Sequence, residues 1–150
     1  MAIDGGLRSL FKDHLRSGWH WQSIETGGTG RGVPDSNFCA SEKRDGVLRG
    51  IEGWVEYKVT DGWTVDLRPE QISWLLERST RGGRCFVAVR RKNQGGPRRG
   101  DPVDEVWIYP GILARRLRLE GLRLNDGLLH RSEGGPSNWD WVRIAEVLTG

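Results

Sequence analysis

The stretch Cys85-Phe-Val-Ala-Val-Arg90 is a short and almost wholly apolar run. A run of this length, apolar at successive positions, is typical of a strand buried on both faces in the interior of a sheet. It follows the pair Gly82-Gly83 and, before that, apolar residues at helical spacing behind Pro69. Because proline favours the first helical position and glycine follows helix ends, we expect a helix that begins at Pro69 and ends at Gly82.

Upstream of this unit the hydrophobic pattern predicts one helix and three strands. Apolar residues recur at intervals of three and four over 7–15, as on one face of a helix. Segments 19–25, 33–40 and 52–60 are expected to be strands, and Asp45-Gly46 between the last two is a hairpin signal.

Downstream, the pattern predicts a strand at residues 105–109, a helix that begins at residue 112 and a helix at residues 138–148. The expected order is therefore αβββαβ, followed by a strand and helices. We expect one α/β domain over residues 1–150, with a mixed central β-sheet flanked by helices. Its core spans about 7–90, and a C-terminal extension covers 104–150.

The composition excludes several classes of protein. The chain has 150 residues, of which 36% are hydrophobic and 29% charged, and its net charge is +3. No apolar run approaches the roughly 20 residues of a transmembrane helix, and the N-terminal segment lacks the features of a signal peptide. The two cysteines and three histidines lack zinc-ligand spacing. We therefore expect a soluble cytoplasmic protein with no membrane partner.

A candidate catalytic set combines Asp35, Glu56 and Lys58. Glu56 and Lys58 are two residues apart on an expected strand, so their side chains share a face, and Asp35 begins the neighbouring strand. Two carboxylates held close together repel unless a cation lies between them, and Mg²⁺ takes one or two carboxylates plus waters and a phosphate. Lys58 adds a charge for a phosphate oxygen or the attacking water. The set suits hydrolysis of a phosphodiester.

A plain ion pair across an exposed sheet face, joining Lys58 to Asp35 or Glu56, would explain the same three residues. Two neighbouring features favour the catalytic interpretation. Val33-Pro34-Asp35 follows a glycine-rich turn, and Gln71 lies on the next expected helix.

These motifs resemble the PD-(D/E)xK nuclease superfamily: GVPD at 32–35, EYK at 56–58 and a helix opening RPEQ at 68–71. Within it, the chain most resembles the phage-type and virus-type replication–repair nucleases (VRR-NUC) and Holliday-junction-resolvase-like endonucleases, over about residues 21–90. The resemblance implies a restriction-endonuclease-like fold and a metal-dependent DNA endonuclease.

The resemblance also implies roles for individual residues. Asp35 and Glu56 would bind Mg²⁺ or Mn²⁺ together with the backbone carbonyl of Tyr57. Lys58 would orient or activate the nucleophilic water. Gln71 would hold Lys58 or a substrate phosphate in position.

An additional acidic residue from the N-terminal region is usual in these enzymes. Our choice is Glu25, in the segment SIETGG before the glycine turn. Asp13 is the reserve candidate, although a solvent-facing place on the first helix explains that residue better.

Positive charges supply candidate DNA contacts without base specificity. Five of them lie between residues 90 and 99, on a connection expected to be flexible, which could clamp a phosphate backbone or simply be a solvated hairpin loop. Arg31, inside the glycine turn, is better placed. The expected DNA-binding residues are Arg31, Arg90, Arg91, Lys92, Arg98 and Arg99.

The resemblance implies a substrate of branched or structured DNA, as in phage recombination and repair, cut on both strands by a homodimer. A phage-encoded protein would act in the host cytoplasm. Two alternatives stay open. One is a DNase that nicks or degrades ordinary duplex or single strands, and the other is a catalytically inactive DNA-binding module on the same fold.

Overall fold

A computed structural model describes residues 3–25 and 30–150 of the chain. Six strands form one mixed sheet in the order β1-β2-β3-β4-β5-β6. Their bounds are β1 Trp19–Ser23, β2 Ser36–Arg44, β3 Val47–Thr60, β4 Cys85–Asn93, β5 Val103–Pro110 and β6 His130–Ser132. The pair β3–β4 is parallel and the other neighbours are antiparallel.

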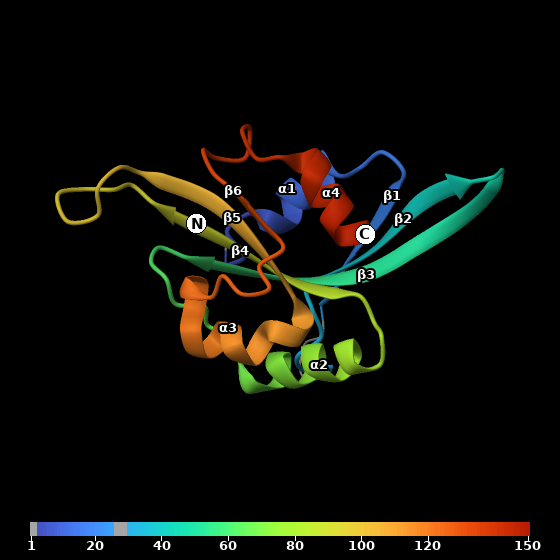
Figure 1. Ribbon diagram of the computed structural model, residues 1–150, viewed down its shortest axis with the longest axis horizontal. Helices are drawn as coiled ribbons and strands as arrows, with labels where there is room; N and C mark the ends of the chain where they lie inside the picture. Colours follow the sequence, from blue (N-terminus) through green and yellow to red (C-terminus); the bar gives the residue numbers. More distant parts are fainter. Residues whose placement is uncertain (1–2, 26–29) are drawn as a thin grey trace.

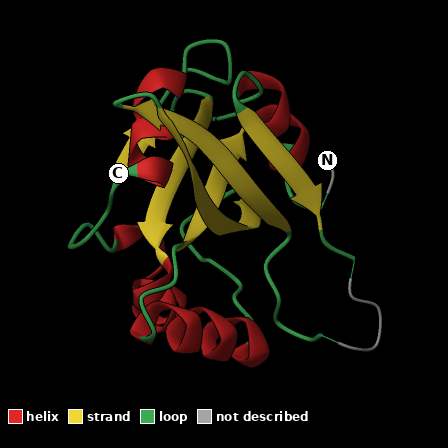
Figure 2. Cartoon of the chain, turned by 90° about the vertical axis from the view of Figure 1, so that its right-hand side faces the viewer, coloured by secondary structure: helices red, strands yellow, loops and turns green. Residues whose placement is uncertain are grey.

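Helices cover both faces of this sheet (Figures 1 and 2). One face carries α1 (Leu7–His14) and α4 (Trp141–Thr149), and the other carries α2 (Pro69–Thr80) and α3 (Ala114–Glu120). Short 3₁₀ turns, Gly111–Leu113 and Gly121–Arg123, flank α3. The expected α/β class and mixed sheet flanked by helices are thus confirmed, as is the order αβββαβ up to β4. The short strand β6 was not predicted. Within the described ranges, no helix is long and apolar enough to cross a membrane.

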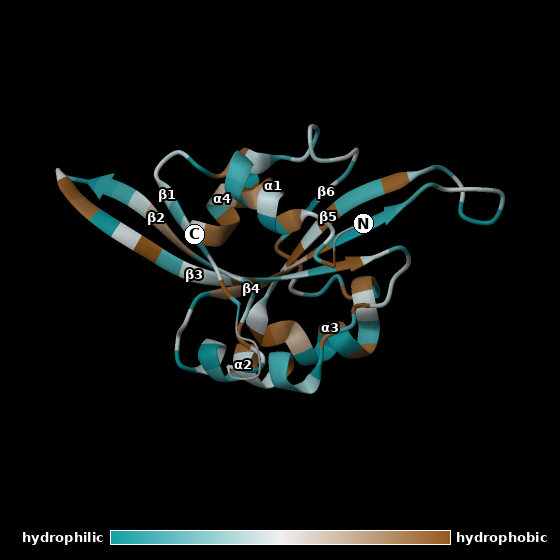
Figure 3. Ribbon diagram, turned by 180° about the vertical axis from the view of Figure 1, so that it is seen from behind, coloured by the Kyte–Doolittle hydropathy of each residue, from teal (hydrophilic) through white to brown (hydrophobic). Residues whose placement is uncertain are grey.

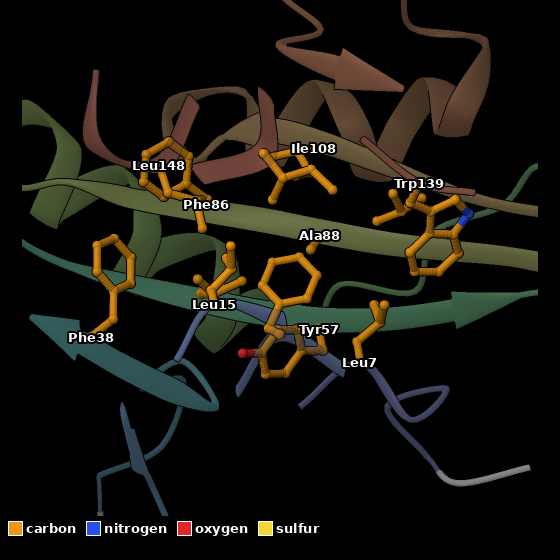
Figure 4. Close-up of a cluster of buried hydrophobic side chains, with 13 residues drawn as sticks. Leu7, Leu15, Phe38, Tyr57, Phe86, Ala88, Ile108, Trp139 and Leu148 are labelled. Carbon is orange, nitrogen blue, oxygen red and sulfur yellow. The ribbon is translucent and has the colours of Figure 1, made fainter. Parts of the chain in front are cut away.

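The cluster between the sheet and α1 fixes the N-terminal helix to β3. Phe11 is fully buried, and its ring meets the ring of Tyr57 edge to face at a centroid distance of 5.5 Å. Trp141 of α4 meets the same phenylalanine at 5.4 Å. Figure 4 shows other members of the cluster, including Ala88 and Leu148. Edge-to-face aromatic pairs add to the gain from burial, so these contacts stabilise α1 beside the middle of β3.

The cluster on the opposite face fixes α2. Ile72 and Leu75 of this helix pack with Val87 and Val89 of β4. Because strand side chains alternate between faces, β3 directs Val55 and Tyr57 to the α1 side and Glu56 to the α2 side. The N-terminus of α2 therefore lies over the part of β3 that carries Glu56.

Two hairpins project from opposite ends of the sheet (Figure 1). The predicted turn at Asp45-Gly46 is confirmed, with φ of 52° and 78°, the left-handed pair that a two-residue hairpin requires. Its strands are longer than expected. They reach the turn itself, and Val47 and Leu48 near the tip are 54% and 71% exposed. Figure 3 shows apolar and polar residues alternating along this arm.

The second hairpin corrects an expectation. β4 does not end at Arg90 but continues to Asn93, paired with β5 from Val103 onward. Arg90 and Arg91 therefore lie within the sheet, opposite Val106 and Glu105. The flexible connection is shorter than predicted.

Candidate functional site

Asp35 stands directly before β2, where the pairing between β2 and β3 has just ended. The last paired residues are Ser36 and Val55. One step further, Asp35 reaches across, and its Oδ2 accepts a hydrogen bond of 2.9 Å from the backbone N–H of Tyr57. The side chain of Asp35 thus takes the place of a β-ladder partner, which brings its carboxyl group to the strand that carries Glu56.

The loop before Asp35 is held against the first turn of α2. Gly32 has φ of 84°, and a Cβ atom there would collide with the backbone carbonyl of Glu70. Only glycine combines this left-handed conformation with such a close approach. The glycine in the sequence GVPD therefore sets the distance between the Asp35 loop and the helix.

Glu56 lies at the centre of the site, with a side chain only 3% exposed. Its Oε1 accepts a hydrogen bond of 2.5 Å from Nε2 of Gln71 and lies 3.8 Å from Nζ of Lys58. Its Oε2 is buried and has no hydrogen-bond partner among the described residues. A buried carboxylate oxygen without a partner is costly and calls for an explanation.

The amide of Gln71 is oriented by the start of its own helix. Its Oε1 accepts a hydrogen bond of 2.9 Å from the backbone N–H of Arg68, so its NH₂ group is directed to Glu56. Gln71 was expected to hold Lys58 or a substrate phosphate; in the structure its NH₂ group contacts the Glu56 carboxylate rather than Lys58. Gln71 caps the helix and positions Glu56 at once.

The electrostatics of the pair are unusual. Burial raises the pKa of Glu56 to about 8, and repulsion from Asp35 adds to this against the attraction of Lys58. Burial also lowers the pKa of Lys58, against the attraction of Glu56. Groups held away from their ordinary protonation states in a pocket are typical of functional sites.

These groups line a pocket of about 510 Å³. Asp35, Glu56, Tyr57, Lys58 and Gln71 all border it, so the structure brings together the five residues expected at its centre. An adjoining hollow of about 440 Å³ shares Asp35, Arg68 and Gln71 with the pocket and adds one further cation, Arg31. The carboxylate of Asp35 therefore borders both hollows.

The N-terminal region contributes residues other than the expected ones. Glu25 follows the end of β1 at Ser23, is exposed, and borders neither hollow within the described part of the chain. Asp13 is exposed on α1 and pairs with Arg16 at 3.9 Å. Asp4 and Arg8 line the pocket instead. Their spacing of four residues at a helix start was the only signal in the sequence.

The predicted DNA-binding arginines divide into two groups. Arg90 is buried, forms a two-bonded pair with Asp104 at 2.8 and 2.7 Å, and donates to the Gly5 carbonyl at 2.7 Å. Arg91 pairs with Glu105 at 3.0 Å. Because these guanidinium groups are engaged inside the protein, the prediction that Arg90 and Arg91 lie free on a loop is wrong.

The remaining predicted contacts are accessible. Lys92, Arg98 and Arg99 are exposed, on or beside the β4–β5 arm, and Arg99 lies 3.3 Å from Asp61 at the end of β3. Arg31 is exposed in the loop before Asp35. The accessible positive charges therefore lie in two places: Arg31 borders the hollow next to the pocket, and Lys92, Arg98 and Arg99 lie around the β4–β5 arm.

The pocket offers few side chains that could bind a metal ion. Among the described residues, no group of three or more His, Cys, Asp or Glu side chains is placed to hold a metal ion. Two carboxylates with a backbone carbonyl nevertheless match what Mg²⁺ takes from proteins, since it keeps several waters. The unpartnered Oε2 of Glu56 is an oxygen that such a cation would satisfy.

Comparison with known proteins adds no assignment. No protein-family model matches the chain, and no curated protein or solved structure matches it either. The chemistry of the pocket is therefore the basis for a functional proposal.

Proposed function

We propose that the protein is a metal-dependent DNA endonuclease that hydrolyses phosphodiester bonds at the pocket between β3 and α2. The observation that carries this proposal is the carboxyl group of Glu56. It is buried, faces Asp35 and Lys58, and has one oxygen without a partner among the described residues. A structural ion pair has no need of a second carboxylate and an unsatisfied oxygen.

Asp35, Glu56 and the carbonyl of Tyr57 would hold Mg²⁺ or Mn²⁺. The N–H and C=O groups of one strand residue point to the same edge, so the Tyr57 carbonyl faces the side on which its N–H meets Asp35. A divalent cation bound there would lower the pKa of a water and stabilise negative charge on the phosphate.

Lys58 and Gln71 have separate tasks in this proposal. Lys58 is partly buried, and its pKa is lowered, so its ammonium group can bind a phosphate oxygen or the attacking water and can exchange a proton. Gln71 holds the Glu56 carboxylate in one orientation through its 2.5 Å hydrogen bond. Fixed geometry of this kind lowers the barrier because the reacting groups need no reorganisation.

A polyanionic substrate fits the charges around the pocket. Arg31 and Arg68 border the adjoining hollow, where they can contact phosphates next to the cleaved one. Lys92, Arg98 and Arg99 extend the positive surface along the β4–β5 arm. Contacts of this type fix the register of DNA without reading its sequence.

The resemblance to Holliday-junction-resolvase-like enzymes favours branched or structured DNA and a homodimer that cuts two strands. A DNase acting on ordinary duplex or single strands uses the same pocket and is the second candidate. The inactive DNA-binding module is disfavoured by Glu56, because two clustered carboxylates repel a phosphate backbone when they serve no cation.

The test is cleavage of four-way junction, flap, linear duplex and single-stranded DNA by the full chain with Mg²⁺ or Mn²⁺, with EDTA as the control. We expect metal-dependent cleavage, fastest on the junction or flap, and a dimer in a sizing measurement. Equal rates on all four would support the second candidate. Salt-sensitive binding without cleavage of any substrate would establish the module instead.

A further inference from the structure

Arg8 of α1 has no role in the scheme above, although it borders the pocket. Its Nη2 lies 3.6 Å from Oδ1 of Asp35, and its Nε lies 3.6 Å from Oδ2 of Asp4. The side chains of Arg8 and Asp35 are 32% and 29% exposed, so the pair stands at the mouth of the pocket rather than in the core.

The position of this guanidinium follows from the use of the two Asp35 oxygens. Oδ2 accepts the N–H of Tyr57, which leaves Oδ1 as the oxygen that faces other partners. Arg8 lies beside that oxygen. A divalent cation held by Asp35 would therefore meet the charge of Arg8 at close range.

The helix that carries Arg8 is packed against β3, whereas the Arg8 side chain is partly exposed. Leu7 and Phe11 on either side of it are fully buried against the sheet. The long arginine side chain can leave Asp35 while its backbone stays in place. Half-exposed ion pairs at such distances are weak, so little is lost when the arginine leaves Asp35.

We propose that Arg8 is an internal counter-ion that competes with the metal for Asp35 and is released to a substrate phosphate when cation and DNA bind together. The inference rests on the proposed nuclease function and adds a positioning residue to it. Metal and DNA then strengthen each other's binding, because the phosphate withdraws the charge that opposes the cation. Coupling of this kind is reciprocal.

The first test measures metal binding without DNA, by calorimetric titration of the full chain with Mn²⁺ and with Ca²⁺. Arg8→Gln removes the competing charge and should tighten metal binding by about three- to tenfold. The matched control is Arg16→Gln, which removes an exposed arginine paired with Asp13 near the end of α1. This control should bind metal as the wild type does.

The second test measures the coupling itself, as the ratio of DNA dissociation constants without and with Ca²⁺. We expect a larger ratio in the wild type and in Arg16→Gln than in Arg8→Gln. Thermal unfolding of each variant tests for loss of the fold. If Arg8→Gln is unfolded, Arg8→Met, which keeps a long unbranched side chain, replaces it.

The outcomes separate this inference from the function on which it rests. Metal binding that is unchanged or weaker in the neutral Arg8 variants, while the wild type binds metal, would overturn the counter-ion role and leave the nuclease proposal standing. A wild type that binds neither Mn²⁺ nor Ca²⁺ at millimolar concentrations would overturn both.

Discussion

Glu56 on β3 and Glu105 on β5 are two glutamates on the same face of one sheet, and each side chain is only 3% exposed. Glu105 is surrounded by donors: Arg91 at 3.0 Å, Arg131 at 3.1 Å and the indole N–H of Trp107 at 3.3 Å. Among the described residues, Glu56 receives one hydrogen bond, from an uncharged amide, and has a lysine at 3.8 Å.

The two environments shift the pKa in opposite directions. Burial alone would raise the pKa of Glu105, but hydrogen bonds from Arg131 and Arg91 outweigh it, and the pKa is lowered. For Glu56, burial and the neighbouring Asp35 dominate, and the pKa rises to about 8. Glu105 is thus an ionised structural residue whose charge is matched by hydrogen-bond donors, whereas Glu56 has few partners and a raised pKa. A raised carboxyl pKa of this kind is typical of catalytic acids.

The largest expected effect separates the two glutamates by activity. Glu56→Gln and Lys58→Ala should each lower the single-turnover cleavage rate by about 10³-fold, because they remove a metal ligand and the charge beside the reacting phosphate. DNA binding should remain within a few-fold of the wild type. Glu105→Gln serves as the matched control and should cleave at a rate close to that of the wild type. A cleavage rate for Glu56→Gln equal to the wild type's would remove Glu56 from the mechanism.

The free energy of unfolding should depend more on Glu105 than on Glu56, the reverse of the order expected for the cleavage rate. Glu105→Ala leaves Arg91 and Arg131 without their shared partner and should lower the free energy of unfolding by about 3 kcal/mol. Glu56→Gln removes a buried charge that has few partners and should leave stability unchanged or raise it near pH 8. Urea denaturation without divalent cations measures both. Equal losses in the two variants would mean that Glu56 is an ordinary structural ion.

The dependence of stability on pH should differ in sign between the two sites. Between the ordinary glutamate value of 4.5 and about 8, folded Glu56 binds more protons than the unfolded chain, so its contribution to stability falls as pH rises. Glu105, with a lowered pKa, contributes stability that is lost as pH falls below 4.5.

Unfolding free energies from pH 3 to pH 9 measure these slopes. Glu56→Gln should reduce the fall in unfolding free energy between neutral and alkaline pH by about 1 kcal/mol or more. Glu105→Gln should reduce the fall in unfolding free energy at acid pH. Saturating Ca²⁺ should also reduce the decline above pH 6 in the wild type, because the cation stabilises ionised Glu56. A decline that Glu56→Gln leaves intact would assign it to other groups.

The smallest effect concerns the arginines of the β4–β5 hairpin. The double change Arg98→Gln and Arg99→Gln should weaken DNA binding a few-fold and reduce the slope of log K against log salt by about 1 to 2. Arg90→Gln removes the pair with Asp104 and should instead lower the unfolding temperature. Fluorescence anisotropy at several salt concentrations, with thermal unfolding in parallel, distinguishes these outcomes.

The sequence predicts most of the fold because its patterns are local. The apolar run at Cys85, the proline that opens α2 and the turn at Asp45-Gly46 each specify an element without reference to distant residues. The three residues Asp35, Glu56 and Lys58 could be grouped because strand alternation and one hairpin pairing suffice to bring them together.

What the sequence could not predict depends on contacts between distant residues. The sequence pattern assigns Arg90 and Arg91 to a basic loop, because their partners Asp104 and Glu105 lie fourteen residues away. Arg8 and Asp4 reach the pocket only because α1 packs against β3 through Phe11. The four-residue spacing of Asp4 and Arg8 indicates that they can pair with each other, but not that they reach the pocket.

The close approach of Gly32 to the carbonyl of Glu70 has a consequence for the mutational tolerance of the chain. Position 32 offers no functional group, yet any side chain there would push the Asp35 loop away from α2. A complete substitution scan selected for activity should therefore find position 32 as intolerant as a metal ligand. Unlike a ligand, it should be rescued by no chemically similar residue, since the constraint is imposed by the main chain of a neighbouring helix.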